Sequence, residues 1–209
     1  MSFFKWVDHL DKILLLLIQR DSDQLVLDPV MRVLREPLTW APLYALLLFY
    51  LIRKYRSRSW LFITLSLLTF AITDSLTAQL LKPLFERQRP CFDPELHSML
   101  RDLVDCGGLY SMPSSHAANH FGLATFWYFA IKTMTGKKWK WVWVWAAAVC
   151  YAQIYVGKHY PSDSRAGGLI GVITGMGTAK LFETWWKRQG EGPRKFLKLY
   201  TFAPDDRSL

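Results

Sequence analysis

The stretch SWLFITLSLLTFAITDSLTAQLL, residues 59–81, is apolar over 23 residues and contains one charged side chain, Asp74. A helix of roughly 20 apolar residues crosses the hydrocarbon core of a bilayer, which is about 30 Å thick. All its backbone hydrogen bonds are made within the helix, as lipid requires. The stretch therefore predicts a membrane-spanning helix, and it sets the fold class expected for the whole chain.

Four more apolar runs accompany it, at residues 38–52, 117–131, 141–157 and 166–182. They are short, so each would need tilt, snorkelling flanks or a locally thin bilayer to span. Their aromatic flanks favour membrane helices over the buried helices of a soluble protein. We predict one membrane-embedded domain covering 1–209, an all-α bundle of five transmembrane helices.

The N-terminal segment, residues 1–36, is apolar but interrupted by charges, which does not suit a signal peptide. One helical face collects Leu10, Ile13, Leu14 and Leu17. This pattern favours an amphipathic helix lying at the membrane interface, with a sixth short span as the alternative. At the other end, residues 190–209 are expected to form a loose, polar cytoplasmic tail.

Basic residues fix the expected orientation. The chain has 26 Lys and Arg against 17 Asp and Glu, a net charge of +9. The basic residues cluster between and after the apolar runs, which argues for a membrane rather than a nucleic acid. Three basic clusters are expected in the cytoplasm: residues 53–58, 132–140 and 187–198. The loop 82–116 and the turn 158–165 then face outside, or the periplasm of a bacterial inner membrane.

Three polar clusters fall at the outer ends of the predicted helices. They are Lys82 with Arg89-Pro90, Pro113-Ser114-Ser115-His116, and His159 with Asp163. Alone, each is typical of a lipid anchor, a helix cap or a solvated turn. Together they supply cations, helix-terminal amides, two imidazoles and a carboxylate. This combination suits phosphoryl transfer, which needs donors and positive charge around the phosphate oxygens.

The same residues carry a resemblance to a known family. Lys82 to Pro90 matches the K-x6-R-P signature of the type 2 phosphatidic acid phosphatase superfamily, and Pro113-Ser-Ser-His116 is similar to its P-S-G-H signature. The third signature, S-R-x5-H-x3-D, is matched by His159 and Asp163. The signatures occur in the family's order.

The resemblance implies that the protein hydrolyses a phosphoester without a metal or other cofactor, through a phosphohistidine intermediate. His159 would be the nucleophile, Asp163 would orient it, and His116 would be the general acid and then the base. The phosphate would be bound by Lys82, Arg89, Ser114, Ser115 and Gln153. The expected substrate is a membrane lipid phosphate or diphosphate. Undecaprenyl diphosphate is preferred, with phosphatidic acid-type lipids and lipid A phosphate as alternatives.

Position 153 departs from the family pattern, because Ala152 and Gln153 occupy the places of the family's serine and arginine. Glutamine keeps a hydrogen-bond donor but loses the charge and the two-pronged geometry of arginine. Nearby cations that would compensate are Lys158, Arg165 and Arg87. Two other functions therefore stay open: a lipid phosphotransferase, and a non-catalytic protein that binds or transports lipid phosphates.

Two further patterns carry structural predictions. Cys91 and Cys106 both lie in the outer loop, where an oxidising compartment would allow a disulfide; two free thiols are the alternative. Gly167, Gly171 and Gly175 recur every four residues in the last span. This small-residue spacing predicts close packing against another helix.

Overall fold

The computed structural model describes residues 3–20 and 24–200, together with the side chains of 5–19 and 25–189. Eight α-helices are present: α1 (Phe3–Arg20), α2 (Gln24–Arg35), α3 (Ala41–Tyr55), α4 (Ser59–Asp74), α5 (Lys82–Phe85), α6 (Ser115–Thr135), α7 (Trp141–Tyr155) and α8 (Pro161–Tyr200). The described residues contain no β-strand, so the predicted all-α fold is confirmed.

All five predicted spans are helical. A π-helical segment, Ser75–Leu81, joins α4 to α5, so that one continuous helix runs over Ser59–Phe85. Within the described ranges this is the one helix long and apolar enough to cross a membrane, and α7 (Trp141–Tyr155) is a shorter apolar helix. The number of transmembrane helices therefore stays a prediction.

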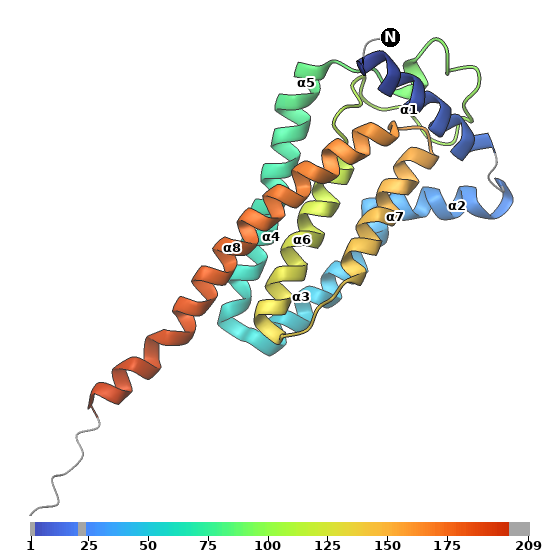
Figure 1. The fold of residues 1–209 in the computed structure, drawn as a ribbon. Coiled ribbons are helices and arrows are strands. Elements are labelled where there is room, and N and C mark those ends of the chain that lie inside the picture. Colours follow the sequence, from blue (N-terminus) through green and yellow to red (C-terminus); the bar gives the residue numbers. More distant parts are fainter. Residues whose placement is uncertain (1–2, 21–23, 201–209) are drawn as a thin grey trace, which may run out of the picture.

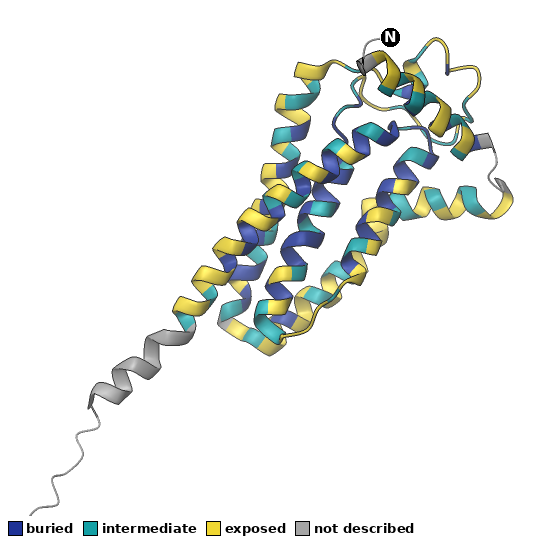
Figure 2. Cartoon of the chain, in the orientation of Figure 1, coloured by how far each residue is buried: buried dark blue, intermediate teal, exposed yellow. Residues whose placement is uncertain are grey.

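Helix α6 is the centre of the bundle, packed against α4, α7 and α8 (Figure 1). Its buried side chains meet aromatic residues of every neighbour: Trp127 stacks on Trp145 with ring centroids 5.7 Å apart, and Phe126 contacts Phe62 and Phe182. Burial concentrates along α6, whereas the outward faces of α4 and α8 are exposed (Figure 2). Those faces carry large apolar side chains, among them Leu67, Phe70, Leu169 and Ile173.

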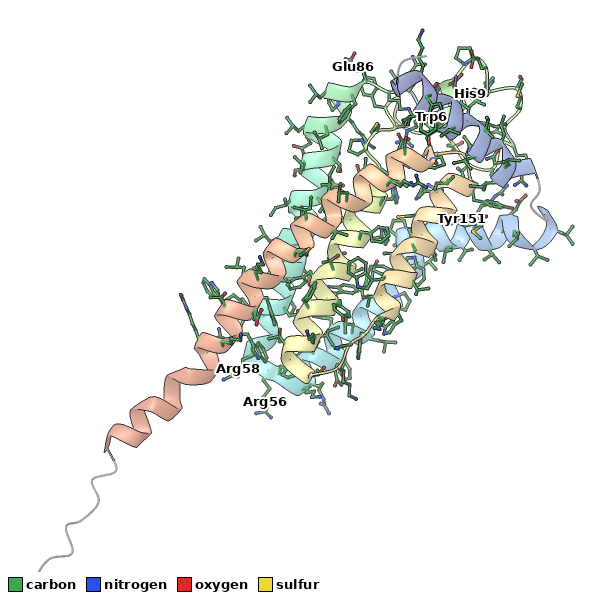
Figure 3. All side chains as sticks on the ribbon, viewed as in Figure 1. Trp6, His9, Arg56, Arg58, Glu86 and Tyr151 are labelled. Atoms are coloured by element: carbon green, nitrogen blue, oxygen red, sulfur yellow. A yellow bond between two sulfur atoms is a disulfide. The ribbon has the colours of Figure 1, made fainter. Side chains whose placement is uncertain are left out.

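The basic connections meet at one end of the bundle. The hydroxyl of Tyr55 donates to the carbonyl of Met134, and Arg58 donates to the carbonyl of Gln189. These contacts join the α3–α4 connection to the ends of α6 and α8. Figure 3 shows Arg56 and Arg58 at this end, far from Trp6, His9 and Glu86 at the other. This grouping is what the positive-inside pattern predicts.

Of the two N-terminal helices, α1 lies over the opposite end of the bundle against α7 and α8, whereas α2 packs beside α7 and projects sideways (Figure 1). The amphipathic character predicted for α1 is confirmed. Its apolar side chains Ile13, Leu14 and Leu17 are exposed, whereas Asp11 and Gln19 are buried against the protein. The face of α1 that contacts the fold combines these polar residues with the buried Leu15, and the exposed apolar residues lie on the other side, so the interfacial location of α1 stays a prediction.

The C-terminal segment differs from the expected loose tail. Helix α8 continues without a break to Tyr200, so the backbone of residues 190–200 is helical. The rest of the predicted tail, residues 201–209, lies outside the described residues.

The glycine stripe of α8 packs against α6, as predicted. A Cβ atom on Gly167, Gly171 or Gly175 would lie 2.2–2.4 Å from a backbone carbonyl oxygen of α6 or its N-cap. The backbones of α6 and α8 are therefore in direct contact, whereas side chains normally separate two packed helices. This contact fixes the start of α8, which carries Asp163, against the start of α6, which carries His116.

Replacing Gly171 with alanine is expected to destabilise the protein by about 1–3 kcal/mol, because the added methyl would overlap the carbonyl of Ala118. Gly177 is the matched control, since it lies on the same helix with open space around it. Alanine there should be neutral or stabilise by up to about 1 kcal/mol. Thermal unfolding in detergent measures both, and equal effects would contradict the close-packing account.

Candidate phosphate-binding site

Backbone hydrogen bonds bring the three sequence clusters together. The amide of Ser111, just before the Ser-Ser-His segment, donates to the carbonyl of Arg87 at 2.7 Å. The amide of Ser114 donates to the carbonyl of Asp163 at 3.0 Å. The side chain of Arg87 closes the triangle with a bond of 2.9 Å to Asp163. Segments that lie far apart in the sequence thus form one site at the end of the bundle covered by α1.

His159 is the most deeply placed of the reactive groups, with 1% of its surface exposed. Burial lowers the pKa of its imidazole, an effect that outweighs the opposing influence of Asp163. The ring is therefore neutral near pH 7, as a nucleophile must be. Its Nδ1 lies 3.7 Å from a carboxylate oxygen of Asp163, which is close but longer than a hydrogen bond. Nε2 is then the ring nitrogen available for attack.

Asp163 is held by several groups at once. One carboxylate oxygen accepts from Arg87 at 2.9 Å, and the other accepts from the amide of Tyr160 at 2.9 Å. Burial alone would raise the pKa of Asp163, but His159, Arg87 and the Tyr160 amide together lower it. A permanently ionised carboxylate thus faces Nδ1 of His159, where it can stabilise an imidazolium.

The start of α6 presents His116 in the first helical turn. Ser114 is the N-cap, and its hydroxyl accepts from the amide of Ala117. The hydroxyl of Ser115 accepts a 2.9 Å bond from Thr77, in the π-helical segment. Each hydroxyl acts as an acceptor in these bonds and keeps its own proton to donate, so the start of α6 can offer an anion the two hydroxyls as well as its free amides and positive dipole end.

Three predicted cations, Lys82, Arg89 and Lys158, act on one another at the site. The charges of Lys82 and Arg89 act on His159, and that of Lys82 also acts on His116. Burial lowers the pKa of Lys158, and the charges of Arg35 and Arg89 lower it further. Mutual repulsion of this kind marks a cationic cluster in need of an anion. Nε of Arg89 is buried without a hydrogen-bond partner among the described residues.

Two of the proposed compensating cations do not serve this purpose. Arg165 is exposed, because it lies two residues from the buried Asp163 and therefore near the opposite face of α8. Arg87 is committed to carboxylates. It binds Asp163 at 2.9 Å and also reaches Asp8 and Asp11 of α1, at 2.9 and 2.8 Å. Arg87 thus holds the site together instead of facing a phosphate.

The structure adds residues that sequence reasoning missed. Asp8 and Asp11 look like interruptions of an apolar run, yet they dock α1 on the site. Asp11 also accepts from the amide of Ser162 at 2.9 Å. Arg35, at the end of α2, has no motif around it. The one available signal for the two aspartates was their shared helical face opposite the leucines.

Gln153 is buried on α7, with 1% of its surface exposed. Neither its amide nitrogen nor its amide oxygen has a hydrogen-bond partner in the part of the chain that is described. A buried unpaired amide is costly, and a ligand is one way to satisfy it. The position where the family carries arginine therefore still offers a polar group.

Cys91 and Cys106 are bonded to each other, as the sequence allowed. They line a pocket of about 270 Å³ together with Lys158, Gly157 and residues of the outer loop. The disulfide thereby fixes the loop beside one of the site's cations. Among the described residues, no group of three or more His, Cys, Asp or Glu side chains is arranged to hold a metal ion.

Comparison with known proteins agrees with this geometry. Residues 63–187 match the PAP2 superfamily model. The chain is 34% identical over 144 residues to a lipid A 4'-phosphatase of Bacteroides thetaiotaomicron, and 32% identical over 148 residues to that of Porphyromonas gingivalis. These matches cover 65% and 69% of this chain, but only 61% of each relative.

A third relative is the bacitracin transport permease protein BcrC of Bacillus licheniformis, 27% identical over 176 residues, covering 84% of this chain and 79% of the relative. No solved structure matches significantly. Because the family model spans more than half of the sequence and contains all three clusters of the site, the chain belongs to the PAP2 superfamily.

Proposed function

We propose that this protein is a membrane phosphatase that removes a phosphate group from a lipid through a phosphohistidine intermediate. The observation that carries the proposal is the meeting of a neutral, buried His159, an ionised Asp163 and His116 within one cluster of cations. A phosphate group carries negative charge, which would neutralise this cluster of cations. The two imidazoles provide the nucleophile and the acid that hydrolysis needs.

In the first step, Nε2 of His159 attacks phosphorus while the bond from phosphorus to the lipid oxygen breaks. Burial and the neighbouring charges lower the pKa of His116 to about 3, so this imidazole must take up a proton together with the phosphate anion, and it then donates that proton to the leaving oxygen. In the second step, His116 takes a proton from water, the water oxygen attacks phosphorus, and the phosphorus–nitrogen bond breaks to release inorganic phosphate. Asp163 stabilises the positive charge on His159 between the steps. Lys82, Arg89 and the amides at the start of α6 neutralise the charge on the phosphoryl oxygens.

A membrane lipid is the substrate class that the fold supports best. The site lies at the end of the bundle away from the basic connections, and exposed apolar surfaces flank it on α4, α8 and α1. A lipid held in the outer leaflet of a bacterial inner membrane would present its phosphate at this depth. The two named lipid A 4'-phosphatases favour a lipid A-type phosphate monoester as the first substrate to test. Undecaprenyl diphosphate and phosphatidic acid-type lipids also fit.

The decisive experiment is a substrate panel with the purified full-length protein in lipid nanodiscs. Lipid A, undecaprenyl diphosphate and phosphatidic acid are each supplied with EDTA, and released phosphate is measured. We expect phosphate release from at least one lipid, unaffected by the chelator. Activity that disappears with EDTA would contradict the metal-free mechanism. Phosphate found on an acceptor lipid instead of in solution would identify a phosphotransferase.

A further inference from the structure

The N-terminal helix α2 delivers an arginine to the site. Asp28, near its start, accepts from Arg101 at 2.8 Å and from the hydroxyl of Tyr155 at 2.6 Å, which fastens α2 to α7 and the outer loop. Arg35 is the last residue of α2. Its side chain is only 13% exposed, whereas apolar side chains of the same helix are exposed on another face.

Aromatic packing fixes where this end of α2 points. The indole nitrogen of Trp40 donates to the carbonyl of Leu34 at 2.9 Å. The same indole packs on Trp145 of α7 at 5.8 Å, and Trp145 packs on His120 at 4.9 Å. His120 lies one helical turn after His116, and the two imidazoles are parallel at 6.4 Å. A chain of ring contacts thus ties the end of α2 to the helix that carries the general acid.

The charge of Arg35 acts on three groups of the site. It acts on His116, and it contributes, after burial, to lowering the pKa of both Lys158 and Arg89. Among the residues whose side chains are described, Arg35 has one ion-pair partner, Glu36, at 2.9 Å, whose side chain is 51% exposed. Nε of Arg35 is buried without a partner in the described residues, as is Nε of Arg89.

A simple alternative is that Arg35 only complements the dipole at the end of α2, as basic residues often do. Arg32 occupies the same last turn and fits that role, because it is exposed. Arg35 differs because its side chain is only 13% exposed and the charges of Arg89 and Lys158 act with it, a crowding of cations that an ion pair with the exposed Glu36 offsets little. The site around it already contains the unpaired amide of Gln153, where the family pattern has arginine.

We propose that Arg35 binds the substrate phosphate and supplies, from α2, the positive charge that Gln153 lacks on α7. The proposal rests on the proposed function for the identity of the ligand as a phosphate ester. Guanidinium and phosphate form two parallel hydrogen bonds, which uses the free Nε of Arg35 together with a terminal nitrogen. The arginine–phosphate contact implied by the family pattern would then be retained, with the arginine on α2 instead of α7.

The test uses the full-length protein and inorganic phosphate as the probe, measured by calorimetry and by the rise in unfolding temperature that phosphate causes. We expect Arg35→Ala and Arg35→Gln to bind phosphate about 10- to 100-fold more weakly, the loss expected for a charge-assisted hydrogen bond. The phosphate affinity of Arg35→Lys should lie between those of these variants and of the original protein, because lysine keeps the charge but not the two-pronged geometry of arginine. Arg32→Ala, the matched control, should bind phosphate as the original does.

Two further readouts separate phosphate binding from a merely structural role. Without phosphate, Arg35→Gln should unfold at the same or a higher temperature, because removing one cation relieves repulsion with Lys158 and Arg89. In the double variant Arg35→Ala with Gln153→Arg, phosphate binding should recover. A variant at Arg35 that binds phosphate as tightly as the original, or a double variant without recovery, would overturn the proposal.

These outcomes remain distinct from those of the substrate panel. A protein that hydrolyses no lipid phosphate, yet loses phosphate binding on substitution of Arg35, would refute the phosphatase function and keep Arg35 as a phosphate ligand. A protein that hydrolyses lipids equally well with and without Arg35, and binds phosphate equally well, would leave the phosphatase intact and refute the role of Arg35.

Discussion

Replacing His159 with alanine is expected to abolish phosphate release, with a loss on the order of 10⁴–10⁶ in kcat, the range seen when a covalent nucleophile is removed. The reason is geometric. His159 is the buried imidazole beside an ionised carboxylate, and its position lies within reach of Lys82 and Arg89. Released phosphate is the measurement, with the lipid that the panel identifies. His9→Ala is the control, since that histidine is exposed on α1.

A covalent intermediate distinguishes the two site histidines. Denaturing the original protein during turnover of a radiolabelled lipid phosphate should trap label on nitrogen, which is stable to base and labile to acid. His159→Ala should carry no label. His116→Ala should still become labelled by p-nitrophenyl phosphate, because that leaving group needs no proton, but it should lose the label slowly. Full turnover by His159→Ala would show that another residue attacks phosphorus.

The three clusters of the candidate site can be found in the sequence because each cluster is local. Each cluster sits beside an apolar run that places it at a helix end, so helix prediction alone brings Lys82, His116 and His159 to one depth. The all-α class and the glycine contact between α6 and α8 follow from periodicity in the same way. Periodicity does not determine how each helix is rotated about its own axis, and so which side chains face the site. This is why Arg165, two residues past Asp163, was an attractive compensating cation and is in fact exposed.

The residues that sequence reasoning missed all come from the N-terminal segment. Helices α1 and α2 precede the family signatures, and nothing in their spacing encodes a contact with residues more than 70 positions away. Asp11 reaches Ser162 across 151 residues, and Asp28 reaches Tyr155 across 127. Such contacts depend on how an amphipathic helix docks on the bundle. Docking is decided by the fit between the surface of the helix and the surface of the bundle, and the spacing of residues within the helix does not encode that fit. Arg87 shows the same limit: its charge was read correctly, but its partners, three carboxylates, were invisible before folding.

Replacing Arg87 with alanine is expected to destabilise the protein by about 3–5 kcal/mol, the cost of leaving buried charges without their partner. Its guanidinium bridges Asp8, Asp11 and Asp163 and lies 4.0 Å from the centre of the Tyr160 ring. Without it, the buried carboxylates of Asp11 and Asp163 would lose their common cation, whereas the half-exposed Asp8 would keep Lys12 at 3.6 Å. Thermal unfolding of the purified protein measures the loss. Arg165→Ala removes an exposed arginine from the same end of α8 and should cost little.

The same network predicts a difference between the two aspartates of α1. The side chain of Asp11 is 5% exposed and also accepts from the amide and hydroxyl of Ser162, whereas that of Asp8 is 46% exposed. Asp11→Asn should therefore release α1 from the site far more than Asp8→Asn, seen as faster hydrogen exchange of the α1 amides. Arg87→Lys should resemble Arg87→Ala, since an ammonium cannot bridge carboxylates on two helices in this geometry. Equal exchange in both aspartate variants would mean that net charge, and not the buried Arg87–Asp11–Ser162 contact, holds α1 over the candidate site.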